Sequence, residues 1–204
     1  MDTGSPRSGE RGYEKIMIQI AMTAQQFLEQ RSEMPEAGQW AELHAGVPVF
    51  LELPDVDHGT AVLNLSKALA GYFQQSPIGY ACFDIGLQLG HQPDTVLFPA
   101  VCLYLGGPMF AESDREITES VPALIVELAS TRNRRAHLEG RILRWLQWGV
   151  REVWSIDPKA LSVQIDTHSQ NRELHGADGR LTSANLPGFE MTVSELFRVP
   201  DWAK

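Results

Sequence analysis

VPALIVELAS, residues 121–130, is an apolar run that carries a single carboxylate, Glu127. A run of this kind is typical of a central strand that is covered on both faces. The next segment, NRRAHLEGRILRWLQWG (133–149), places its apolar residues at helical spacing and ends in a glycine, which is a helix stop signal. VREVWSIDP (150–158) then alternates as a second strand. A strand, a helix and a strand in this order predict a βαβ crossover, so we expect an α/β fold in which helices flank a mixed β-sheet.

Shorter elements are expected on either side of this unit. Two long strands, YACFDIGLQL (80–89) and TVLFPAVCLYL (95–105), are separated by a turn and should pair as neighbours. After residue 170 we expect only turns and a final helical turn. The remaining predicted elements are a short helix capped by Thr23 and Gln26, two short strands around Gly46, a helix over 58–73 and a strand over 161–169.

The composition limits the class of protein. With 204 residues, of which 43% are hydrophobic, we expect one domain over 22–204 after a disordered N-terminal extension over 1–21. The net charge of −9 argues against broad, sequence-independent adhesion to nucleic acid. The two cysteines exclude a disulfide framework or a cysteine-rich zinc site and fit a reducing cytoplasm. Because no apolar run is long enough to cross a bilayer, we expect a cytoplasmic protein without a membrane partner.

Glu127 is the residue of the central strand that needs an explanation. Charged side chains are almost never fully buried without partners. Two interpretations stay open on the pattern alone. The carboxylate is either satisfied by neighbouring backbone or arginine, or it is a metal-binding or acid–base group held at the edge of a sheet.

Several strings follow one another in a characteristic order: MTAQQFL, ELHAG, HGTAVLNLSKALAGYF, VPALIVELAS, GVREVWSIDP and LPGFEMTVSELF. In their order and spacing, residues 22–197 resemble the Uma-type endonuclease family, a branch of the restriction-endonuclease-like PD-(D/E)XK superfamily. The resemblance implies a DNA endonuclease that hydrolyses phosphodiester bonds with Mg²⁺ or Mn²⁺. Such a metal prefers hard oxygen ligands, neutralises charge on the phosphate and lowers the pKa of its bound water.

The catalytic pattern that the resemblance implies is only partly present. The two glutamates of the pattern match Glu42, in ELHAG, and Glu127. The metal-binding aspartate that follows a proline matches Ala100, in FPAV, so a ligand position is vacated there. The supporting lysine matches Arg141, and the acidic residue one turn earlier matches His137. An arginine binds phosphate well but stays protonated and cannot accept a proton.

Other residues near these positions are candidates for the same site. Asp84 is a candidate substitute metal ligand beside Glu127, although strand alternation could equally direct it to solvent. A phosphate track beside Glu127, with a solvated helix face as the alternative, is suggested by a cluster of arginines: Arg132, Arg134, Arg135, Arg141, Arg144 and Arg151. The candidate nucleic-acid-binding residues of this track are Arg132, Arg134 and Arg135. We further expect that a carboxylate at position 100 would project toward Glu127.

Two functions therefore remain. The first is a metal-dependent DNA endonuclease with a degenerate active site, in which Glu42, Glu127 and Arg141 take the catalytic positions. The second is a catalytically inactive nuclease-fold module that binds nucleic acid or a protein partner and needs no metal. DNA is the expected partner, and a homodimer would suit the cutting of both strands.

Overall fold

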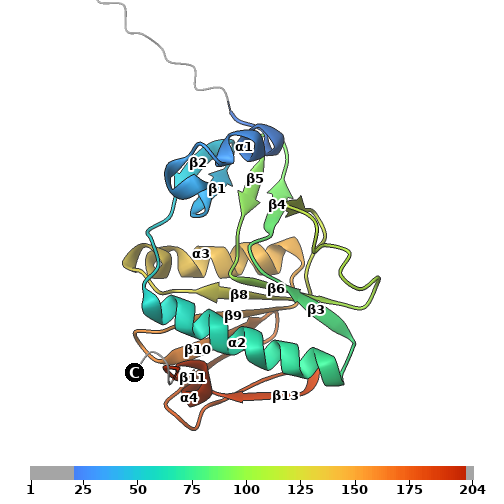
Figure 1. Cartoon of the computed structure of the whole chain (residues 1–204), viewed down its shortest axis with the longest axis vertical. Helices are drawn as coiled ribbons and strands as arrows, with labels where there is room; N and C mark the ends of the chain where they lie inside the picture. Colours follow the sequence, from blue (N-terminus) through green and yellow to red (C-terminus); the bar gives the residue numbers. More distant parts are fainter. Residues whose placement is uncertain (1–20, 201–204) are drawn as a thin grey trace, which may run out of the picture.

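The computed structural model describes residues 21–200. The extension expected over 1–21 falls outside these residues apart from its last one. Within 21–200, none of the helices has the length and apolar character needed to cross a membrane. The structure has a large sheet, a small sheet and a C-terminal hairpin, with helices between and around them (Figure 1).

A six-stranded mixed sheet forms the centre of the structure. Its strands lie in the order β11-β10-β9-β8-β6-β3. The apolar run around Glu127 is β8, which pairs with β9 in parallel and with β6 in antiparallel fashion. The βαβ prediction is therefore confirmed. The strands are β3 (Gly79–Cys82), β6 (Val101–Leu105), β8 (Leu124–Leu128), β9 (Glu152–Asp157), β10 (Ser162–Thr167) and β11 (Asn171–His175).

Two long helices cover opposite faces of this sheet (Figure 1). The first, α2 (Val56–Gln75), packs Leu65 and Leu69 on one face. The second, α3 (Arg132–Trp148), packs Ile142 and Trp145 on the other. It begins at the Thr131 cap and ends at Gly149, whose φ of 111° lies in the left-handed region that favours glycine. The sheet therefore contributes side chains to two separate cores.

The small sheet lies above α3 and the large sheet in the view of Figure 1. Its strands have the order β2-β1-β5-β4-β7. Its first hairpin turns at Gly46, as the sequence predicts, and α1 carries the expected capping box between Thr23 and Gln26. The elements of this part are α1 (Ala24–Arg31), a 3₁₀ turn (Pro35–Gly38), β1 (Ala41–His44), β2 (Val47–Phe50), β4 (Gly86–Gly90), β5 (Thr95–Leu97) and β7 (Ile117–Thr118).

The two long strands predicted over 80–89 and 95–105 are each broken in the middle. The halves next to the connecting turn, β4 and β5, pair in the small sheet. The halves away from the turn, β3 and β6, pair in the large sheet. The first break falls at Asp84, which has a φ of 52°, and the second at Pro99, which has no N–H for a sheet ladder. Their pairing as neighbours is confirmed, but the chain changes sheets at both breaks.

The C-terminal part contains more regular structure than the sequence indicates. Strand β11 extends the large sheet, and β12 (Arg180–Ser183) pairs with β13 (Leu186–Thr192) as a separate hairpin. The expected final helical turn is α4 (Val193–Leu196). Leu181, Phe189 and Leu196 join the core beneath α2. These strands escape prediction because polar residues and glycines interrupt their short apolar pattern.

Candidate functional site

Glu42, Glu127 and Arg141 meet where the small sheet approaches α3 and the large sheet. Glu42 comes from β1, Glu127 from β8 and Arg141 from the middle of α3. Arg141 Nη1 donates to Glu42 Oε2 at 2.7 Å and to Oε1 at 3.0 Å. On its other side, Arg141 Nε and Nη2 each lie 2.9 Å from Glu127 Oε1. One guanidinium thus bridges two carboxylates that lie far apart in the sequence.

Both carboxylates have further donors. Trp145 Nε1, one turn after Arg141, donates to Glu127 Oε1 at 2.6 Å. The Phe98 backbone N–H donates to Glu42 Oε1 at 2.9 Å, and His44 Nε2 lies 3.0 Å from Glu42 Oε2. With exposures of 0% for Glu42 and 3% for Glu127, both side chains are effectively removed from solvent. The first interpretation of Glu127, a buried carboxylate with an arginine partner, is therefore what the structure shows.

Two carboxylates share one guanidinium in this cluster. Burial raises the pKa of Glu42, but Arg141 and the hydrogen bonds from His44 and Phe98 outweigh it and hold the pKa at about 2. For Arg141, burial works against the charged form, yet Glu127 and Glu42 raise its pKa above the ordinary arginine value. Arg141 therefore remains a cation, and Glu42 an anion, at neutral pH.

Ala100 immediately precedes β6, beside β8, and its N–H donates to the Val126 carbonyl at 3.0 Å. Ala100 packs against the core beneath α2. It also lines a pocket of about 190 Å³. Because Trp40 forms part of the wall, we call this the tryptophan pocket. Glu127 instead faces α3 and lines a pocket of about 470 Å³, together with Arg134, Arg141 and Arg144, that we call the arginine pocket. The expectation that position 100 projects toward Glu127 is wrong. Ala100 instead shares the tryptophan pocket with Glu42, which borders both pockets.

Asp84 does not join Glu127. It lines the tryptophan pocket near Ala100, and its carboxylate is 66% exposed and lies 3.4 Å from Arg31 Nη2. Strand alternation does not apply to it because it occupies the turn between β3 and β4. Across residues 21–200, no three histidine, cysteine, aspartate or glutamate side chains gather in a way that could hold a metal ion.

The three candidate arginines of the track point in different directions. Arg134 lines both pockets, and its guanidinium lies 5.5 Å from the Trp40 ring centre. Arg135 Nη1 instead donates to the Ala129 carbonyl at 3.0 Å and lies 3.7 Å from Asp157. Arg132 is exposed and lines neither pocket. Only Arg134 of this set therefore belongs to the site.

Three further residues line the site, of which Arg144 already belongs to the expected arginine track. His44 lies two positions after Glu42 on the same strand, so period-two alternation could have placed both on one face. Arg144 follows Arg141 by three positions, which helical spacing brings to the same face of α3. Trp40 lies just before β1, and no periodic signal places it beside Arg134.

Comparison with known proteins assigns the chain to a family. A family model described as "Putative restriction endonuclease", named Uma2, matches residues 24–194. The chain belongs to the Uma2 family. The Uma2 chain also matches the crystal structure of a "putative nuclease belonging to DUF820" from Anabaena variabilis, with a TM-score of 0.70 and 17% identity over 86% of this chain and 97% of the other. That likeness supports the nuclease-like α/β fold. No curated protein matches the chain.

The Uma2 fold implies a divalent metal, and the residues present do not fit one. Mg²⁺ needs several converging hard oxygen ligands. Here the guanidinium of Arg141 occupies the space between Glu42 and Glu127, and the position that should add a third carboxylate is Ala100. His137, where the family pattern has an acidic residue, is exposed and lies 2.9 Å from the Asn133 carbonyl. The donor set therefore resembles a closed ion cluster and not an open metal site.

Proposed function

We propose that this Uma2 protein is a nuclease-fold module with a degenerate active site, which binds nucleic acid without hydrolysing it through a metal ion. The observation that carries the proposal is the bridge from Arg141 to both Glu42 and Glu127. The guanidinium of Arg141 occupies the position between the carboxylates where the chemistry of the family needs a divalent metal ion.

Arg141 also cannot act as the general base that the hydrolysis of a phosphodiester bond would need. Its guanidinium stays protonated, and the neighbouring carboxylates raise its pKa further, so it cannot activate a water molecule. To enter between the carboxylates, Mg²⁺ would have to displace this arginine and break buried, charge-assisted hydrogen bonds. Both effects favour binding over catalysis.

The arginine pocket supports the binding part of the proposal. Three arginines and two glutamates line this pocket, and both glutamates pair with Arg141, so neither Arg134 nor Arg144 forms an ion pair with a residue that lines the pocket. Arg134 Nε is buried and has no hydrogen-bond partner within the described residues. Phosphate oxygens are suitable partners for such a group. Since the whole chain carries a net charge of −9, this local excess of positive charge stands out against its surroundings.

Adding Mg²⁺ or Mn²⁺ at millimolar concentration is expected to change the melting temperature by less than about 1 °C, because ligand stabilisation requires occupancy of the folded state. Under the same conditions we expect no nicking of supercoiled plasmid DNA above a metal-free control. The measurements are differential scanning fluorimetry and agarose gel electrophoresis. A large thermal shift together with nicking that Glu127→Gln abolishes would instead establish the endonuclease function.

Binding is expected to persist in EDTA and to depend on Arg144. Arg144→Ala should weaken binding of a fluorescein-labelled DNA oligonucleotide by about 5- to 10-fold and reduce the slope of log affinity against log salt by about 1. Arg151→Ala, which removes an exposed arginine that lines neither pocket, is the matched control and should bind as the natural protein does. Fluorescence anisotropy measures both. Equal losses in the two variants would assign the binding to general surface charge.

A further inference from the structure

The tryptophan pocket lies directly beside the arginine pocket. The two share Glu42, Leu51 and Arg134 as common walls. The tryptophan pocket also opens into a shallow groove over the start of α2, with which it shares Trp40, Phe83 and two further residues. The three hollows therefore form one continuous surface that runs from the arginines to a pair of aromatic rings.

The aromatic side chains of this surface are held in place. The Arg134 guanidinium lies 5.5 Å from the Trp40 ring centre, within the range of a cation–π contact. His58 meets the same tryptophan ring edge-on, with 6.0 Å between the ring centres, and its Nδ1 lies 2.9 Å from Ser130 Oγ. Phe83 is 42% exposed. Trp40 is thus fixed by its neighbours, while Phe83 offers an open ring beside it.

The charges on this surface are compatible with a phosphate-bearing ligand. Burial, with a contribution from Arg134, lowers the pKa of His58 to about 4, so its ring is neutral at physiological pH. The two carboxylates in the wall are already paired, Glu42 with Arg141 and Asp84 with Arg31. An aspartate at position 100 would add an unpaired negative charge in this wall. Ala100 adds none, and its small side chain leaves the pocket open.

We propose that the tryptophan pocket receives an unstacked nucleobase, so that the ligand of this protein is single-stranded nucleic acid and not an intact duplex. Arg134 and Arg144 bind the phosphate, and the base lies against Trp40 and Phe83. This inference rests on the nucleic-acid binding proposed above and specifies its substrate class. A volume of about 190 Å³ is below the range of about 300–1,000 Å³ that holds drug-sized ligands, and it suits one ring system. Bases in a duplex are stacked and paired and cannot enter such a pocket without being extruded.

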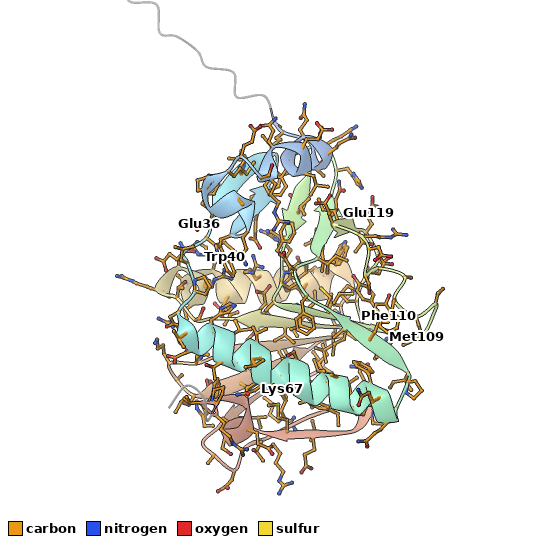
Figure 2. All side chains as sticks on the ribbon, viewed as in Figure 1. Glu36, Trp40, Lys67, Met109, Phe110 and Glu119 are labelled. Atoms are coloured by element: carbon orange, nitrogen blue, oxygen red, sulfur yellow. The ribbon has the colours of Figure 1, made fainter. Side chains whose placement is uncertain are left out.

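The test compares a fluorescein-labelled oligothymidylate of about 15 nucleotides with a mixed-sequence duplex of the same length, by anisotropy in EDTA. The natural protein should bind the single strand about 10-fold or more tightly than the duplex. Trp40→Ala and Phe83→Ala should each weaken single-strand binding by about 5- to 100-fold, the range typical of a lost base–aromatic stack, with little change for the duplex. Phe110→Ala is the matched control, because Phe110 is 61% exposed and lies on the far side of the molecule from Trp40 (Figure 2). It should bind as the natural protein does.

The outcomes separate the two proposals. If Arg144→Ala weakens binding while Trp40→Ala and Phe83→Ala bind normally, or if the duplex binds as tightly as the single strand, the base pocket is wrong and nucleic-acid binding stands. If neither oligonucleotide binds at low salt, nucleic-acid binding itself fails and the base pocket fails with it. Phe83 is exposed, so Phe83→Ala keeps the test decisive even if Trp40→Ala does not fold.

Discussion

Arg141→Met destabilises the protein by about 3–5 kcal/mol at pH 7, the cost expected when one partner of a buried ion pair is removed and its counter-charges stay behind. The loss is large because one guanidinium is the shared ion-pair partner of two carboxylates whose residues are 0% and 3% exposed. For a chain of this size it should lower the melting temperature by roughly 6–20 °C. Urea denaturation and calorimetry measure both quantities.

The same substitution should weaken the pH dependence of stability that Glu42 contributes. In the natural protein the pKa of Glu42 falls from 4.5 to about 2 on folding, so its contribution is complete above pH 4.5 and is lost as the pH falls toward 2. Without Arg141, burial is opposed only by the hydrogen bonds from His44 and Phe98, so the pKa of Glu42 in the folded protein should rise. The stability difference between Arg141→Met and the natural protein should therefore shrink as the pH falls from 4.5 toward 2.

Arg144→Met is the control for this experiment. It makes the same substitution at an exposed arginine of the same helix and should lower the free energy of unfolding by less than about 1 kcal/mol. An Arg141→Met variant that is as stable as Arg144→Met, or that shows the pH dependence of the natural protein, would contradict the view that Arg141 neutralises the buried carboxylates.

The double variant Ala100→Asp/Arg141→Lys is expected to bind Mg²⁺ and to nick plasmid DNA above the metal-free control, which the natural protein should not do. Lysine has a single ammonium group and cannot reproduce the fork that holds both glutamates, so it leaves carboxylate oxygens available to a metal. An aspartate at position 100 adds a hard oxygen ligand in the wall that Glu42 also borders. Unlike arginine, lysine can be tuned toward a proton-transfer role.

This variant also makes a prediction about stability. An unpaired aspartate in a half-buried wall costs a few kcal/mol, so the double variant should melt below the natural protein without metal and recover when millimolar Mg²⁺ is added. Adding Glu127→Gln should abolish both the recovery and the nicking. If the double variant neither gains metal-dependent stability nor cuts DNA, position 100 is not a vacated ligand position.

The sequence predicts the local structure of the site better than its geometry. The Gly149 end of α3, the strand that carries Glu127, and the βαβ crossover all follow from caps and periodicity, which act over a few residues. The breaks at Asp84 and Pro99 depend on how two sheets meet. Local patterns contain no information about such long-range packing.

The same limit applies to the side chains. That Glu42, Glu127 and Arg141 belong together followed only from resemblance to a family, and no residue pattern predicted that the guanidinium would bridge both carboxylates. The orientation of position 100 was predicted wrongly, because alternation along an assumed continuous strand does not survive the turn at Pro99. Arg132 and Arg135 were grouped with Arg134 by proximity in sequence, yet helical geometry directs successive residues to different sides.

The bridge through Arg141 joins β1 of the small sheet to β8 of the large sheet, so the residue that we propose excludes the metal also links two parts of the fold. Arg141→Lys alone gives up this link, and Ala100→Asp alone places an unpaired charge beside Glu42. Each single step toward a metal-binding set is therefore disadvantageous, and only the two together, with a metal ion, offset the loss. If the proposed function holds, a change to metal-dependent cleavage requires passage through a less stable intermediate sequence.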